Sequence, residues 1–319
     1  MTATATTRAA TLARRVPITA WLPRYRRGWL VGDLLNGLVV AALAIPQALG
    51  YAGIAGVPVI VGLYSIPLAL IAYAVLGSSP NLVVGPVSTV SVMSGTLVAG
   101  MAAGDPGKAV AFTAALAIGA GLGMLAAGLL RLGWAAEFLS RPIVTGFVFG
   151  LVLLIIVGEI PGLLGLPSVT GDVPTRMLAT LGSLGSIVPA AAAVGIASLA
   201  ILFAGAHWAP RVPWGLVVLI GAIALSSTVD LAALGVPTVG PVPRGLPPIS
   251  LPGVGMGELP QLLFGGLALA LVGLAEGLSA ARLFAVRDGI TVDSNQELIA
   301  TGAANLASGL SSGMGVAGS

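Results

Sequence analysis

Long apolar segments make up most of this chain, and short polar or Gly/Pro-rich connections separate them. A helix needs about 20 mostly apolar residues to cross the hydrocarbon core of a bilayer, so segments of this length predict membrane spans. The approximate ranges of the expected spans are 33–51, 57–76, 80–101, 109–130, 142–160, 177–206, 214–229, 259–281 and 295–310. The pattern therefore predicts an all-α polytopic membrane protein.

The third segment is interrupted near its start. Residues 81–84 are mostly apolar or β-favouring, Gly85 and Pro86 then break the backbone, and a helix-length stretch follows. Pro86 suits the first turn of a helix, where its missing N–H costs nothing. Broken backbone at membrane depth is tolerated only in the protein interior or beside a water-lined cavity. We therefore expect a short strand, and then a half-helix that begins within two residues of Pro86, as in the substrate sites of many secondary transporters.

The start of this half-helix is a candidate anion site. A helix N-terminus offers free N–H groups and a partial positive charge, and Val87, Ser88 and Thr89 fall in that first turn. Gln47 and Tyr51 lie four residues apart on one face of the first span and are candidates for lining the same site. Two alternatives stay open: the hydroxyls serve close helix packing, or Gln47 forms a hydrogen bond between helices.

Composition excludes most other classes of protein. The chain is 57% hydrophobic and 8% charged, with a mean hydropathy of +1.05, whereas soluble domains carry about a quarter charged residues. It has no Cys, a single His (His207) and no His/Asp/Glu cluster, so we expect no metal and no cofactor. No nucleophile–base pair supports an enzyme. The basic pI of 9.8 is better explained by membrane orientation than by nucleic-acid binding.

Charge predicts the orientation. Residues 1–31 contain six arginines and no acid, and we place this segment in the cytoplasm. With alternating spans, only Lys108, Arg176 and Arg244 then fall outside, as the positive-inside rule requires. All five Trp fall at the predicted cytoplasmic interface, and the expected location is the inner (plasma) membrane. The eleven basic residues predicted inside are Arg8, Arg14, Arg15, Arg24, Arg26, Arg27, Arg131, Arg141, Arg211, Arg282 and Arg287.

Glu276 is the one acid well inside a predicted span. Ionisable groups at membrane depth are expensive and usually functional, so Glu276 is a candidate proton-coupling residue. The alternative is a structural carboxylate paired with Arg282 or with backbone N–H groups. The polar run 293–297 is interpreted as structural, because Ser294 and Glu297 have the spacing of a capping box. Gly119-x-Gly-x-Gly123 is interpreted as helix packing, because no strand precedes it.

The last residues, 311–319, are again Gly-rich and lead toward another half-helix. Gly318 and Ser319 are therefore candidates for the second half of the site. They lie seven spans after the first break, and an odd repeat length predicts opposite orientation, that is, an inverted repeat. The expected organisation is an N-terminal segment 1–31, a first repeat 32–230 and the start of a second repeat 231–319.

Several motifs together resemble the sulfate permease (SulP) family of anion transporters. Near the N-terminus they are Asp33-Leu-Leu-Asn-Gly-Leu, Ile45-Pro-Gln-Ala-Leu-Gly-Tyr-Ala, Gly62-Leu-Tyr, Gly77-Ser-Ser and Gly85-Pro. Near the C-terminus they are Glu276, Ala281-Arg282-x-Phe284-Ala, Asn295-x-Glu297-Leu, Gly302 and Asn305. The resemblance covers nearly the whole chain.

The resemblance implies fourteen spans in two inverted repeats of seven, divided into a core and a gate domain and often followed by a STAS domain. This chain ends at the start of span ten, so it looks like a fragment, and we expect that it does not transport on its own. In such families the anion lies between half-helices three and ten, near the positions of Gln47 and Tyr51, and the family suggests a homodimer.

The resemblance also bears on coupling. Sodium-coupled bicarbonate members carry an Asp in span eight with a Thr four residues on, whereas this chain has Glu276 and Ala280. Glu276 with Arg282 and Phe284 is more similar to proton-coupled sulfate members. The leading expectation is proton-coupled sulfate uptake. The alternatives are bicarbonate or dicarboxylate transport, a nucleobase transporter of the same architecture, and a non-transporting membrane scaffold.

Overall fold

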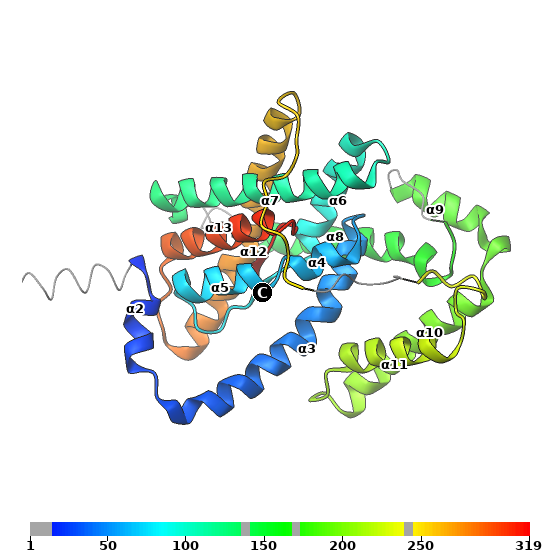
Figure 1. The fold of residues 1–319 in the computed structure, drawn as a ribbon, viewed down its shortest axis with the longest axis horizontal. Coiled ribbons are helices and arrows are strands. Elements are labelled where there is room, and N and C mark those ends of the chain that lie inside the picture. Colours follow the sequence, from blue (N-terminus) through cyan, green and yellow to red (C-terminus); the bar gives the residue numbers. More distant parts are fainter. Residues whose placement is uncertain (1–14, 135–140, 168–172, 239–244) are drawn as a thin grey trace, which may run out of the picture. The chain divides into compact units, whose positions relative to one another are not determined.

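The structure is a computed structural model that describes residues 15–134, 141–167, 173–238 and 245–319. Arg8, Arg14 and Arg244 of the orientation argument lie outside the described residues, and so do the side chains of Arg141, Phe284 and Arg287. The described part of the chain is mainly helical (Figure 1). Its elements are α2 (Ile18–Trp21), η1 (Leu22–Arg24), η2 (Arg27–Trp29), α3 (Leu30–Ile54), α4 (Val59–Tyr64), α5 (Pro67–Leu76), β1 (Val84–Gly85), α6 (Ser88–Ala102), α7 (Pro106–Leu129), α8 (Arg141–Leu163), α9 (Val173–Gly182), η4 (Leu184–Ser186), α10 (Pro189–Trp208), α11 (Trp214–Thr228), α12 (Leu259–Asp288), α13 (Ser294–Leu310) and β2 (Ala317–Gly318).

The predicted spans correspond to these helices with two differences. The second span is two helices, because Pro67 starts α5 anew after the short helix α4. The sixth span, expected over 177–206, is too long. The short helix α9 and the turn η4 precede it, and the long helix α10 begins only at Pro189. The apolar composition runs on through this connection, so hydropathy alone does not mark the break.

The break in the third span is present. The strand β1 comes first, and α6 begins at Ser88, two residues after Pro86, as predicted. Two details were wrong. The strand, Val84–Gly85, overlaps the expected segment 81–84 only at Val84 and extends one residue past it, and Pro86 lies before the N-cap residue Val87 instead of in the first helical turn.

The chain forms two compact units. The first comprises Met1–Leu35, Ala48–Val144 and Arg244–Ser319. Within it α7 packs mainly on α13 and α12, and α13 also packs on α5, so that α13 lies between α5 and α7 (Figure 1). Large, fully buried side chains of this core come from α7, α12, α13 and the segment after α13, namely Phe112, Leu116, Met124, Leu262, Leu269, Leu298 and Met314.

Glycines allow the helices of the first unit to approach closely. A Cβ added at Gly302 of α13 would lie 2.8 Å from the Leu125 nitrogen and 2.9 Å from the Gly121 oxygen of α7. A Cβ added at Gly119 of α7 would lie 3.2 Å from the Gly266 Cα of α12. Small residues at such crossings let backbones meet, which is the usual device of helices packed in membranes. The packing interpretation of the Gly119 motif is confirmed.

The second unit comprises Asn36–Gln47 and Thr145–Pro243. Here α10 packs against α11, and the close contact is between Gly205 and Trp214: a Cβ at Gly205 would lie 2.2 Å from the Trp214 ring. The indole nitrogen of Trp214 donates to the Ala209 carbonyl at 3.0 Å. Spans two to four, eight and nine belong mainly to the first unit, and spans five to seven belong mainly to the second. The division into a core and a gate domain stays a prediction.

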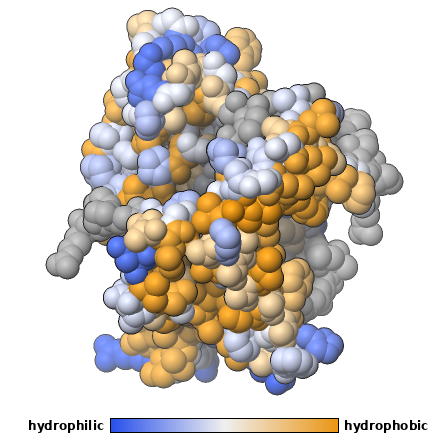
Figure 2. Space-filling view, turned by 90° about the vertical axis from the view of Figure 1, so that its right-hand side faces the viewer, coloured by the Kyte–Doolittle hydropathy of each residue, from blue (hydrophilic) through white to orange (hydrophobic). Residues whose placement is uncertain are grey.

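Much of the surface is apolar. Among the described residues, five helices are long and apolar enough to cross a membrane: Arg27–Ile54, Val59–Leu76, Pro106–Leu129, Pro189–Trp208 and Leu259–Arg282. On α3 the side chains of Val31, Leu34 and Leu38 are each at least 65% exposed. Figure 2 shows apolar side chains over much of the visible face, with strongly hydrophilic residues in a few small groups. The chain is therefore a multi-pass membrane protein.

Candidate functional site

Two short strands form the centre of the candidate site. β1 pairs antiparallel with β2, with Val84 opposite Gly318 and Gly85 opposite Ala317. The pairing continues one residue outward, where Val83 and Ser319 exchange N–H···O bonds of 3.2 and 3.0 Å. The first break in the helical pattern and the Gly-rich C-terminal stretch, more than 200 residues apart in sequence, are thus joined directly.

Glycines and small side chains let β2 fit between its neighbours. A Cβ at Gly318 would lie 2.1 Å from the Leu82 Cδ2 atom, so a larger residue here would have to displace the Leu82 side chain. On the other side α12 approaches β2 at Gly277, where a Cβ would meet the Gly318 nitrogen at 3.4 Å. This close approach places the middle of α12, including Glu276, beside the strand pair.

A side-chain amide holds the segment that leads into β2. Asn305, which is 1% exposed on α13, donates to the Val316 carbonyl at 2.7 Å and accepts from the Val316 nitrogen at 2.9 Å. Ser308 and Ser65 hold Met314 in a similar way: the Ser308 hydroxyl donates to its carbonyl at 2.5 Å, and its nitrogen donates to the Ser65 hydroxyl at 2.7 Å. Buried backbone groups need partners of this kind. These contacts fix the backbone that ends in β2.

The start of α6 faces Glu276. The hydroxyl of Thr89, the second residue of α6, donates a hydrogen bond to the Glu276 carboxylate. Tyr51 of α3 contacts the Ser88 side chain and interacts electrostatically with Glu276. The N-cap residue Val87 provides no side-chain cap, so the first N–H groups of α6 are left for another partner. A carboxylate, two hydroxyls and a phenol therefore meet at one helix start.

The structure places the predicted site residues as follows. It brings together Tyr51, Ser88, Thr89 and Glu276 through the contacts above. Val87 and Gly318 are buried in the backbone framework, whereas Ser319 is exposed and its nitrogen pairs with Val83. Gln47 is exposed on α3 and belongs to the second unit. Its role in binding stays a prediction.

The capping-box interpretation of Glu297 is wrong. The N-cap residue of α13 is Asp293, whose carboxylate accepts from the nitrogens of Asn295 and Gln296 at 3.0 and 3.2 Å. Glu297 points elsewhere and is buried, and it binds Tyr73 and the turn at Ser78. Asp293 occupies the N-cap position, where its carboxylate reaches the first-turn N–H groups, and Ser294 is the first residue of the helix and not its cap.

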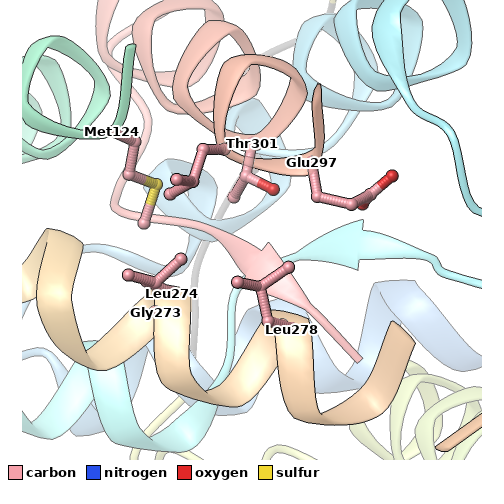
Figure 3. A pocket seen from close by; sticks show the side chains of 8 residues that line it. Met124, Gly273, Leu274, Leu278, Glu297 and Thr301 are labelled. Atoms are coloured by element: carbon pink, nitrogen blue, oxygen red, sulfur yellow. The ribbon is translucent and has the colours of Figure 1, made fainter. Parts of the chain in front are cut away.

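A small cavity lies beside the strand pair and is too small for the anion. It is lined by residues of α7, α12 and α13 and has a volume of about 10 Å³, which is room for one water. Figure 3 shows Leu274 and Leu278 of α12 facing Met124 and Thr301 across it. In the described ranges, no three His, Asp or Glu side chains come together as a metal site.

Sequence reasoning missed Asn305 and Ser65 as parts of the site framework. Their partners, Val316 and Met314, lie on a segment whose path only the fold defines. From the sequence, Asn305 stands out only as part of the motif shared with the family. The signal available in the sequence was the Asn305 amide among small residues of an expected membrane span. A polar group buried there requires a hydrogen-bond partner.

A half-helix paired through a short strand to a second broken segment, inside a bundle of apolar helices, defines a membrane transporter of the broken-helix class. The sequence profile described as the sulfate permease family matches residues 30–319. The chain belongs to the sulfate permease family, whose members are transporters and not enzymes.

Curated relatives agree with this assignment. The chain is 37% identical over 295 residues to a probable sulfate transporter of Mycobacterium tuberculosis, covering 92% of this chain and 53% of that protein. It is 32% identical over 328 residues to human solute carrier family 26 member 6, covering 94% of this chain and 43% of that protein. The chain thus spans about half the length of the curated relatives it matches.

Solved structures share the fold. The transmembrane domain of a cyanobacterial bicarbonate transporter, BicA, superposes with a TM-score of 0.82 at 26% identity, covering 92% of this chain and 76% of that one. The structure of SLC26A9 superposes with a TM-score of 0.91 at 24% identity, covering 100% of this chain and 53% of that one. The likeness to SLC26A9 supports the fold alone.

Proposed function

We propose that the protein acts in secondary active uptake of an inorganic anion, sulfate in the first instance, together with a proton. The observation that carries this proposal is the hydrogen bond from Thr89 to Glu276 at the uncapped start of α6. Helix starts attract anions through their free N–H groups and partial positive charge. Here the same helix start faces an ionisable carboxylate.

This geometry gives a physical reason for coupling. An ionised Glu276 accepts a hydrogen bond from the Thr89 hydroxyl and places a negative charge beside the position an anion would take. A proton on Glu276 removes that charge and leaves the Thr89 hydroxyl free to donate to the anion. Proton and anion then each favour the binding of the other, because linkage between two sites is reciprocal.

The choice of anion rests on the relatives. The Mycobacterium tuberculosis relative is named a probable sulfate transporter, which supports sulfate. Bicarbonate is the second candidate, because a structural neighbour at 26% identity is a bicarbonate transporter domain. The side chain of Ala280, one turn after Glu276, offers no oxygen ligand, so we expect binding that does not depend on sodium.

A binding experiment separates these possibilities. The purified chain in nanodiscs is unfolded by heat with sulfate, bicarbonate, a dicarboxylate, uracil, or chloride of matched ionic strength. A ligand that binds only the folded state stabilises it, by about 2.7 kcal/mol at 100 times its dissociation constant. We expect stabilisation by sulfate. Stabilisation by uracil alone would indicate a nucleobase transporter, and no stabilisation by any solute would indicate a scaffold.

We also propose the membrane arrangement predicted from charge: a cytoplasmic segment 1–31, a repeat over 32–230, the start of an inverted repeat over 231–319, and a homodimer in the plasma membrane. The chain has no Cys, so single cysteines can be introduced one at a time. A cysteine at Arg27 should react with a membrane-impermeant reagent only from the cytoplasmic side, and one at Lys108 only from the outside. The reverse pattern would overturn the orientation.

A further inference from the structure

Glu297 is a buried carboxylate that the proposed coupling mechanism does not use. It lies in the first turn of α13 and is 3% exposed. Its Oε2 atom accepts from the Tyr73 hydroxyl of α5 at 2.7 Å. Its Oε1 atom accepts from the Ser78 nitrogen and hydroxyl, each at 2.7 Å, and from the Ser79 nitrogen at 3.0 Å. Carboxylate oxygens accept hydrogen bonds, so these four donors satisfy both oxygens of the Glu297 side chain.

These contacts hold the connection between α5 and β1, residues 77–83. Glu297 binds its first residues, and the amide of Asn81 donates to the Asp288 carboxylate of α12 at 2.6 Å. Gln296, beside Glu297, donates to the Leu76 carbonyl at the end of α5 at 2.6 Å. Ser79 precedes the strand β1 by only five residues. The position of β1 and of the following α6 start therefore depends on this anchored connection.

The carboxylates of Glu276 and Glu297 differ in their surroundings. Glu276 is half-buried, and the one hydrogen bond described for its side chain comes from Thr89. Glu297 is surrounded by four donors, and a proton on it would place an O–H group among them. Figure 3 shows the Glu297 carboxylate pointing away from Met124 and Leu274. Different surroundings give two carboxylates different roles.

We propose that Glu297 is a positioning residue for the anion site. It fixes residues 77–83, and through them β1 and the first turn of α6, in the arrangement that binds the anion. The inference rests on the proposed function, because its effect is read as anion affinity. It assigns Glu297 no contact with the anion and no part in proton transfer.

The test is a double-mutant cycle on the chain in nanodiscs. Glu297→Gln keeps the size of the side chain but replaces one carboxylate oxygen, which accepts hydrogen bonds, with an NH2 group, which donates them. We expect sulfate affinity to fall about tenfold, the usual scale for hydrogen bonds to a charged group. Tyr73→Phe alone should weaken binding about threefold, and added to Glu297→Gln it should cost less than it does alone, because the two side chains share one hydrogen bond.

The controls separate failure of this inference from failure of the proposed function. Sulfate must first bind the unmodified chain; if it does not, the proposed function fails. Glu258→Gln removes a charge from a carboxylate whose hydrogen bond, among the described residues, comes from the exposed Gly255 nitrogen, and should leave affinity unchanged. If Glu297→Gln does not fold, Ser78→Ala removes one donor and should weaken binding about threefold. Unchanged affinity in Glu297→Gln and Ser78→Ala, or a Tyr73→Phe effect that adds in full to that of Glu297→Gln, would overturn the inference.

Discussion

The hydroxyl of Thr89 donates a hydrogen bond to the carboxylate of Glu276, which joins the first turn of α6 to the middle of α12. The sequence suggests separate roles for the two residues, the hydroxyl as an anion ligand and the acid as a coupling group. In the structure they share one contact. An anion at the start of α6 and an ionised Glu276 therefore compete for the same donor.

Replacing Thr89 by Val should weaken sulfate binding. Val keeps the shape of the side chain and removes the hydroxyl, so one net hydrogen bond of about 0.5–1.5 kcal/mol is lost, or roughly 2- to 13-fold in affinity. Thr89→Ser is the matched control, because it keeps the hydroxyl and should retain most of the affinity. Calorimetry with sulfate at acidic pH measures both. Equal affinity of the Val variant and the original chain would show that the hydroxyl does not face the anion.

Replacing Gly318 by Ala should push the strands apart. The new Cβ would lie 2.1 Å from the Leu82 Cδ2 atom, and such overpacking usually costs about 1–3 kcal/mol. We expect a lower unfolding temperature and weaker sulfate binding, both relieved by adding Leu82→Ala. Gly277→Ala is the control, because its Cβ would meet the Gly318 nitrogen at an ordinary 3.4 Å. A Gly318→Ala variant with unchanged stability would argue against the described β1–β2 packing.

Replacing Asn305 by Leu should destabilise the segment before β2. The Val316 nitrogen and carbonyl would lose their partner inside the protein, at a cost of about 1–3 kcal/mol for each group left unpaired. Asn36→Leu, an identical change at an exposed position on α3, should have little effect. Thermal unfolding of the two variants in the same nanodiscs makes the comparison. Equal unfolding temperatures would contradict the role given to Asn305.

Much of the fold follows from local signals. Apolar length located the spans, and Gly85-Pro86 predicted the break, because both depend on residues close together in the chain. The error in the sixth span shows the limit of this approach. Residues 182–189 contain turn-forming Gly, Ser and Pro, but Leu184, Ile187 and Val188 continue the apolar pattern, so apolar length alone joined α9 and α10 into one span.

The site was predicted less completely, and Glu297 shows why. Its spacing from Ser294 fits a capping box, which is a local pattern. Its partners Tyr73, Ser78 and Ser79 lie more than 200 residues away in sequence, and only the packing of α13 on α5 brings them near. The contact between Thr89 and Glu276 likewise depends on tertiary structure. The residue types were predicted, but their pairing was not.

The most direct test of the coupling proposal is the pH dependence of sulfate binding in the original chain and in Glu276→Gln. Protonation of Glu276 should favour the anion, so affinity in the original chain should rise as the pH falls, by at most about tenfold per pH unit for one coupled proton. Glu276→Gln resembles the protonated form in shape and charge, so it should bind sulfate tightly at every pH, with this dependence lost. If Glu276→Gln kept the pH dependence of the original chain, Glu276 would not be the coupling residue.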